Sequence, residues 1–288
     1  MLTVYANAKI NLTLDVLNKR PDGYHEVEMV MQEVDLADHL TFREQKEGIT
    51  VCTNIPDLAC DNTNLAYKAA HLIKTIYNIE QGIQIDLNKR IPMAAGLAGG
   101  STDAAGVLIG LNKLWHLGIS LDELSRLGAL LGSDVPFCLN GGTMLATGRG
   151  EVLERLSNMP ACNVILAKPA VSVSTAWVYK NYRSSAVSAH PDTAGIIKCL
   201  EADDLDGIAS RLCNTLETVT IPVHPEIGRL KALMCEYGAM ASLMSGSGPT
   251  VFGLTPDTER ANYIAAKLEK LSDAQIIVAK TVAKSGGE

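Results

Sequence analysis

The chain has 288 residues, of which 47% are hydrophobic and 20% are charged, and its formal net charge at pH 7 is −7. This length exceeds one typical domain and supports a sizeable core, so we expect one large domain or two medium ones. The acidic balance argues against nucleic acid or an anionic membrane as the partner.

The cysteines and histidines show no metal or disulfide pattern. The seven cysteines are irregularly spaced, without a CxxC pair, and the six histidines form no HxxxH or HExxH motif. Reduced thiols are the natural interpretation. The chain also has no signal-like start and no uncharged apolar run of ~18 residues. We therefore expect a cytoplasmic protein without a membrane partner; its oligomeric state stays open.

The first predicted strand is unusually long. From Val4 to Val16 every even position is apolar and most odd positions are polar. This period of two indicates an extended segment with one buried face, with a bend near Asn7 because it exceeds a typical strand. Lys9, Asn11 and Thr13 share the opposite face, which we expect to be accessible.

Further elements follow from periodicity and from turn residues. Pro21-Asp-Gly23 predicts a turn, and Pro136 is expected to keep its predecessor out of a helix. Strands are predicted at 27–36, in hairpins within 37–53 and 143–155, and at 83–87, 162–168, 241–244, 250–254 and 275–282. Helices are predicted at 65–77, 103–115, 121–131, 174–182, 192–201, 204–213, 224–237 and 257–271.

A glycine-rich segment lies between the strand 83–87 and the helix 103–115. Gly96, Gly99 and Gly100 precede the helix start. Glycines permit positive φ, and free N–H groups at a helix N-terminus bind anions, so the pattern suggests a phosphate site. The alternative is a small-residue loop that only lets a helix pack closely. Neither GxxxxGK[ST] nor a Rossmann GxGxxG is present, so any phosphate site is of another type.

Three segments together resemble the motifs of the GHMP kinase superfamily. Residues 92–102 are similar to its second motif, 244–250 to its third and 8–12 to its first. They occur in the right order over nearly the whole chain, which makes the match specific. The resemblance implies an α+β, two-domain GHMP kinase fold, with an N-terminal part like domain 2 of ribosomal protein S5 and a C-terminal ferredoxin-like α/β sandwich.

The resemblance also implies a separate binding function for each of the two domains. We expect the boundary near Asn158, with an ATP-binding domain at 1–158 and a substrate domain at 159–288. An S5-like scaffold raises the alternative of an RNA-binding module. The acidic charge and the lack of a basic stripe count against that alternative.

Within the superfamily, the segments 9–12, 20–25, 132–137 and 245–250 resemble one branch. That branch uses ATP to phosphorylate the 2-hydroxyl of a small cytidine diphosphate derivative of methylerythritol, on a route to isoprenoid precursors. Kinases acting on homoserine or mevalonate are the nearest alternative. Mg²⁺ is expected to bridge the ATP phosphates, and the sequence leaves its side-chain ligand open.

The implied catalytic residues are Asp134 and Lys9. By resemblance, Asp134 accepts the hydroxyl proton, while Lys9 keeps that carboxylate ionised and offsets transition-state charge. Without the resemblance, Asp134 could equally be a turn residue and Lys9 an ordinary strand lysine.

The implied binding residues form two groups. The nucleotide is assigned to Pro92, Met93, Ala94, Ala95, Gly96, Leu97, Ala98, Gly99, Gly100, Ser101 and Thr102. The substrate is assigned to Asn11, Tyr24, His25, Thr175, Tyr179, Ser245, Gly246, Ser247 and Gly248. His25 is expected to hydrogen-bond the cytosine, Tyr24 to line its site and Tyr179 to stack on the base, with Trp177 and Tyr182 as competing candidates for stacking.

Overall fold

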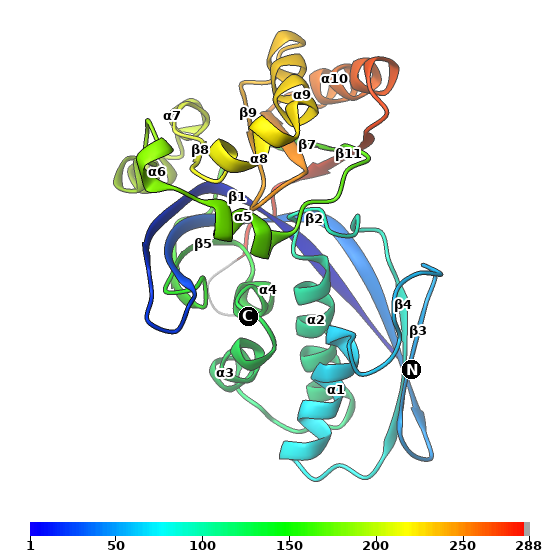
Figure 1. Ribbon diagram of the computed structural model, residues 1–288. Helices are drawn as coiled ribbons and strands as arrows, with labels where there is room; N and C mark the ends of the chain where they lie inside the picture. The colour runs from blue at the N-terminus through cyan, green and yellow to red at the C-terminus, as the bar shows by residue number, and fades with distance from the viewer. Residues whose placement is uncertain (285–288) are drawn as a thin grey trace. The chain divides into compact units, whose positions relative to one another are not determined.

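A computed structural model describes residues 1–284, which form a mixed α and β chain with two sheets (Figure 1). The strands are β1 (Leu2–Lys19), β2 (His25–Gln45), β3 (Ile49–Thr53), β4 (Gly82–Asn88), β5 (Thr143–Thr147), β6 (Val152–Arg155), β7 (Asn163–Lys168), β8 (Cys213–Asn214), β9 (Ala241–Met244), β10 (Val251–Thr255) and β11 (Gln275–Lys280). The helices are α1 (Leu65–Ile76), α2 (Gly99–Leu114), α3 (Leu121–Leu131), α4 (Val135–Asn140), α5 (Thr175–Asn181), a 3₁₀ turn (Ser184–Ala186), α6 (Thr193–Glu201), α7 (Leu205–Ser210), α8 (Glu217–Val223), α9 (Pro225–Glu236) and α10 (Thr258–Leu271). Within this described part, no helix is long and apolar enough to span a bilayer.

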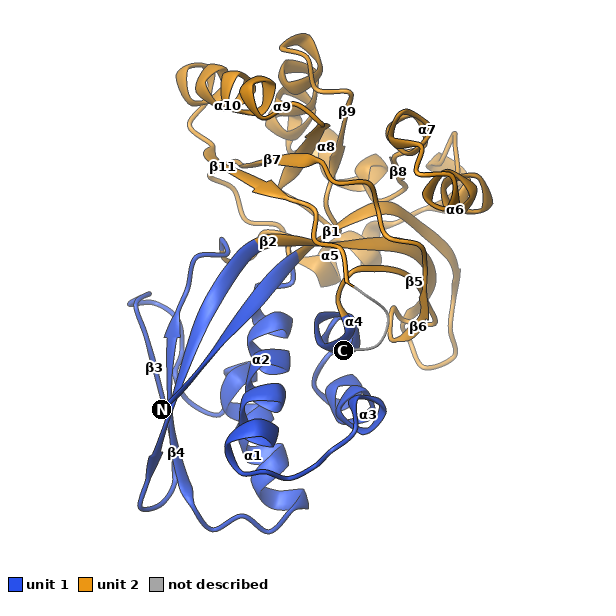
Figure 2. Cartoon of the chain, turned by 180° about the vertical axis from the view of Figure 1, so that it is seen from behind, with its two compact units in different colours: residues 1–8, 36–92, 98–140 blue, residues 9–35, 93–97, 141–288 orange. Residues whose placement is uncertain are grey.

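The chain divides into two compact units that are interleaved along the sequence (Figure 2). Unit 1 contains residues 1–8, 36–92 and 98–140, and unit 2 contains residues 9–35, 93–97 and 141–288, of which those up to 284 are described. Strands β1 and β2 therefore contribute residues to both units. The boundary expected near residue 158 stays a prediction.

Unit 1 is built around small residues on α2. Its core joins residues of β2 and β4 to the buried faces of α1 and α2, and α3 and α4 pack against α2. A Cβ at Gly106 would lie 3.0 Å from Leu40, and one at Gly110 would lie 2.5 Å from the ring of Phe42. These glycines bring the helix backbone close to β2.

Unit 2 contains an antiparallel sheet in the order β11-β7-β10-β9. Helices α9 and α10 pack against its strands. Along the chain, β7 is followed by helices, then by β9 and β10, then by α10 and β11. Strands β7 and β10 lie in the middle of the sheet. This is the ferredoxin-like arrangement, so the expectation of a ferredoxin-like C-terminal part is confirmed.

Two local expectations are wrong. The segment 27–45 was expected to contain a strand and part of a hairpin, but β2 runs unbroken for 21 residues because no glycine or proline interrupts it. Pro136 is expected to keep its predecessor out of a helix, but Val135 is the first residue of α4 and Pro136 is the second. Proline fits the first turn of a helix, where the missing N–H would have no intrahelical partner.

Candidate active site

The two glycine-rich turns of the GHMP-like motifs contact each other within unit 2. The hydroxyl of Ser245 donates to the carbonyl of Gly96 at 3.0 Å. Gly96 has φ +74°, and a Cβ there would lie 2.2 Å from the carbonyl oxygen of Ser245. Both the left-handed backbone and the close approach require glycine.

Side chains from unit 2 hold the second turn in place. Asn214 donates through Nδ2 to the carbonyls of Met244 and Gly246, both at 2.8 Å. Thr220 donates to the carbonyl of Ser247 at 3.2 Å. These supports were missed by the sequence reasoning, because asparagine and threonine side chains are too common to mark a distant loop contact.

Two predicted substrate residues meet in unit 2. The hydroxyls of Thr175 and Ser247 lie 2.8 Å apart. Thr175 is the first residue of α5, where Ser174 caps the helix by accepting from the N–H of Trp177. The cap and the hydroxyl contact fix the start of α5 beside the second glycine-rich turn.

Helix α2 begins at Gly99, four residues earlier than expected. Ala98 precedes it with φ +61°, and the first N–H groups of a helix have no intrahelical partners. Thr102 differs from its neighbours, because its hydroxyl donates to the carbonyl of Asn7 at 2.6 Å and its N–H donates to Ala98 at 2.9 Å. Thr102 is only 1% exposed, so the free amides of this helix start lie before it.

Lys9 and Asn11 are buried, with exposures of 4% and 0%, and Lys9 Nζ donates to Asn11 Oδ1 at 2.7 Å. Thr13 is also 0% exposed. The expectation of an accessible face here is wrong. Lys9 and Asn11 lie against the glycine-rich turns, and Thr13 Oγ1 accepts the N–H of Val30 at 2.9 Å. The N–H of Lys9 donates to the carbonyl of Leu97 at 3.3 Å, and a Cβ at Gly246 would lie 3.6 Å from Asn11 Oδ1.

Asp134 lies in unit 1 between α3 and α4 and is half-buried. Its carbonyl accepts the N–H of Cys138 at 3.1 Å, so the residue opens α4. The backbone of Asp134 therefore has the turn role of the alternative interpretation. The catalytic role that the resemblance implies depends on its carboxylate.

His25 and Tyr179 face each other in unit 2. Their ring centroids are 5.5 Å apart with an interplanar angle of 30°. Two rings that sandwich a base must be roughly 7 Å apart, twice the optimal carbon separation, so this spacing suits an edge contact from His25 better than a sandwich. Burial lowers the pKa of His25 below its ordinary value, and nearby Lys19 adds to this effect. The neutral imidazole can both donate and accept a hydrogen bond.

Tyr24 stays 55% exposed at the end of the predicted turn. Its N–H donates to Asp22 Oδ1 at 3.1 Å, and the guanidinium of Arg149 lies 5.0 Å from its ring centroid. Arg149 was not expected here, because it comes from the β5–β6 connection. A cation over the ring stabilises the tyrosine in this orientation.

The two competing aromatics differ in environment. Tyr182 is 9% exposed, and its hydroxyl donates to the carbonyl of Val16 at 3.1 Å. Burial raises the pKa of that phenol. Tyr182 therefore has a structural role, whereas Trp177 is 40% exposed.

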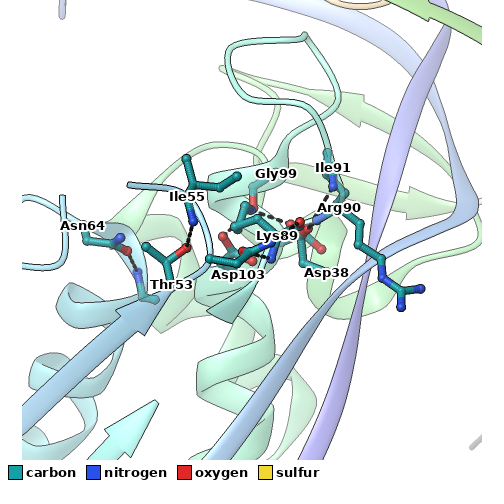
Figure 3. A network of polar contacts seen from close by, with 12 residues as sticks. Asp38, Thr53, Ile55, Asn64, Lys89, Arg90, Ile91, Gly99 and Asp103 are labelled. Carbon is teal, nitrogen blue, oxygen red and sulfur yellow. Dashed lines mark hydrogen bonds and ion pairs between the residues drawn. The ribbon is translucent and has the colours of Figure 1, made fainter. Parts of the chain in front are cut away.

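A buried charge cluster, formed by Asp38, Lys89 and Asp103, lies in unit 1 (Figure 3). Lys89 Nζ donates to a carboxylate oxygen of both acids, at 2.5 Å for Asp103. The side chains are 0%, 4% and 5% exposed in chain order. Burial raises the pKa of Asp103 to about 7, with Asp38 adding to the rise and Lys89 opposing it. No sequence motif marked this cluster, because its members come from β2, from the residue that follows β4 and from α2.

Comparison with known proteins identifies the family. The model of the GHMP kinases N-terminal domain matches residues 64–142, and the model of the GHMP kinases C-terminal domain matches residues 196–273. Together they cover more than half of the chain. The chain belongs to the GHMP kinase family. The two matched stretches lie on either side of residue 158.

Individual family members are similar over most of the chain. The 4-diphosphocytidyl-2-C-methyl-D-erythritol kinases of Bacillus cereus (strain AH187) and Bacillus anthracis (strain CDC 684) are each 52% identical over 264 residues, or 91% of both chains. A crystal structure of 4-(cytidine 5'-diphospho)-2C-methyl-D-erythritol kinase is 33% identical, with a TM-score of 0.83 and coverage of 99% of this chain and 100% of that one. Homoserine kinase from Cytophaga hutchinsonii shares the fold at 21% identity, with a TM-score of 0.78 and coverage of 98% and 94%. The predicted two-domain GHMP kinase fold is confirmed.

Proposed function

We propose that this GHMP kinase transfers the γ-phosphate of ATP to the 2-hydroxyl of 4-diphosphocytidyl-2-C-methyl-D-erythritol, a step of the methylerythritol phosphate route to isoprenoids. The 52% identity to kinases of that name over 91% of the chain carries this proposal. The residues of unit 2 support it, because His25 and Tyr179 offer a hydrogen-bonding edge and a ring for a base. Homoserine and mevalonate have no base to occupy such a site.

Asp134 and Lys9 have separate roles in the proposed reaction. The carboxylate of Asp134 accepts the proton of the substrate hydroxyl as its oxygen bonds to the γ-phosphorus, and the bond from that phosphorus to the bridging oxygen breaks to release ADP. Lys9 offsets negative charge on the transferring phosphoryl group. The N–H groups at the start of α2 that lack intrahelical partners bind the ATP phosphates. The glycine-rich turn 245–248 contributes to binding of the acceptor.

Magnesium fits this proposal on chemical grounds. When bound, Mg²⁺ would offset the negative charge of the ATP phosphates. We propose that phosphate oxygens and water supply most of its coordination, with no protein side chain assigned.

The decisive experiment is a coupled ADP-release assay on the full chain with a panel of acceptors. We expect turnover with 4-diphosphocytidyl-2-C-methyl-D-erythritol and none above background with homoserine or mevalonate. Turnover with homoserine or mevalonate alone would replace the proposed substrate.

A variant tests the base-binding site. His25→Ala should raise the KM for the cytidylated acceptor by about 10-fold or more, since a lost hydrogen bond in a site built for it costs over 1 kcal/mol. The KM for ATP should not change. The control is His71→Ala, which removes an exposed histidine from α1, and an unchanged acceptor KM in His25→Ala would show that the base binds elsewhere.

A further inference from the structure

The buried charge cluster contacts the backbone on both sides of the glycine-rich loop. Asp38 Oδ1 accepts the N–H groups of Arg90 and Ile91, at 2.5 and 2.9 Å, just before Pro92. Lys89 Nζ donates to the carbonyl of Gly99, the first residue of α2, at 3.3 Å. Figure 3 shows these contacts converging on the Lys89 ammonium and the Asp38 carboxylate.

The two sides of the loop lie directly against each other. A Cβ at Gly99 would lie 3.2 Å from Ile91 Cγ2 and 3.5 Å from Lys89 Nζ. The first turn of α2 therefore packs on the segment that the cluster holds. A shift of the Lys89 ammonium would displace the backbone amides at the helix start.

Stability alone does not explain these charges. A lysine near a helix N-terminus is opposed by the positive end of the helix dipole. Buried ion pairs lose much of their attraction to desolvation, and apolar replacements of similar volume are often equally stable. Asp103 Oδ1 is also buried without a hydrogen-bond partner among residues 1–284, which adds a further cost.

We propose, building on the proposed function, that Lys89 is a positioning residue for ATP. Its ammonium, held by Asp38 and Asp103, fixes the position of Ile91 relative to Gly99. The N–H groups at the start of α2 are thereby oriented toward the nucleotide phosphates. The cluster then acts on ATP binding and phosphoryl transfer without touching the acceptor.

The test compares three variants of the full chain. Lys89→Met removes the charge and keeps most of the apolar stem. The triple variant Asp38→Asn, Lys89→Met, Asp103→Asn removes all charge, yet keeps an oxygen at residue 38 for the two backbone N–H groups. The control Asp86→Asn breaks the partly exposed ion pair with Arg43 (2.9 Å), which lies on the same sheet.

Two quantities are measured for each variant, namely the Kd for ATP in the absence of acceptor and the KM for the acceptor. We expect Lys89→Met and the triple variant to raise the Kd for ATP by about 10- to 100-fold, because a displaced amide loses a hydrogen bond to a charged phosphate, which is worth about 1.5–3 kcal/mol. The acceptor KM should change less than twofold, and Asp86→Asn should match the wild type.

The triple variant separates positioning from folding, because it leaves no buried unpaired charge. If it folds, melts like the wild type and binds ATP equally well, Lys89 has no positioning role. A parallel loss of ATP and acceptor binding would also overturn the proposal. If the wild type itself binds no ATP, the proposed function is wrong. This outcome differs from the one that overturns the role of Lys89, in which the wild-type and variant chains bind ATP with the same affinity.

Discussion

At the scale of single residues, the carboxylate of Asp134 is the proposed proton acceptor. Asp134→Asn keeps the shape of the side chain but cannot take the proton, so kcat should fall about 10²- to 10⁴-fold. The Kd for ATP should stay unchanged. Steady-state ADP release and ATP titration measure the two effects, with Asp122→Asn, an exposed position on α3, as the control. An Asp134→Asn protein with wild-type kcat would exclude this role.

Asp103 should make the stability of the protein depend on pH. Burial raises its pKa from an ordinary 3.8 to about 7. Between these two values the folded chain binds more protons than the unfolded chain, so the contribution of Asp103 to the free energy of unfolding decreases as the pH rises.

The Asp103→Asn variant lacks this titration. The free energy of unfolding of the variant minus that of the wild type should therefore be higher at about pH 8 than at about pH 5. Urea unfolding at both pH values measures the difference, with Asp86→Asn as the matched variant. An equal stability difference at both pH values would contradict the raised pKa.

At the scale of secondary-structure elements, α2 depends on the glycines that face β2. Gly110→Ala adds a methyl group 2.5 Å from the ring of Phe42, which is 0% exposed and cannot yield easily. Overpacking of this kind costs about 1–3 kcal/mol, which exceeds the roughly 1 kcal/mol that alanine contributes to helix propensity. We expect a lower free energy of unfolding in chemical denaturation.

The control for this prediction is a second helical glycine. Among residues 1–284, a Cβ at Gly228 in α9 would meet only the Ile221 Cγ2 methyl, at 3.2 Å. Gly228→Ala should thus destabilise less than Gly110→Ala. The opposite order would show that helix propensity dominates over packing at Gly110.

At the scale of the whole molecule, a kinase and an RNA-binding module differ in the ligand that stabilises the folded chain. A ligand that binds only the folded state at 100 times its Kd adds about 2.7 kcal/mol to the free energy of unfolding. We expect Mg²⁺–ATP to raise the thermal unfolding midpoint in a concentration-dependent way. Single-stranded RNA at the same concentration should not, since the net charge is −7. A higher unfolding midpoint with RNA but not with Mg²⁺–ATP would favour the RNA-binding module.

Several elements could be predicted because their signals are local. Asn64, Ser120 and Asp257 each cap the helix that follows, and α3 has the predicted bounds. The family resemblance identified the two glycine-rich turns, whose contact at Gly96 and Ser245 the structure describes. The catalytic and binding roles of the predicted site residues stay predictions.

The sequence by itself therefore determined the family, the proposed chemistry and most element positions, because residue spacing, helix caps and motifs each depend on residues that are close together in the sequence. Only the tertiary structure decided that Lys9 and Asn11 are buried, that Tyr182 is structural and that Lys89 lies between two acids. Each of these depends on which distant segment covers a side chain. The period of a strand specifies two faces, but the burial of each face is set by the parts of the chain that pack on it.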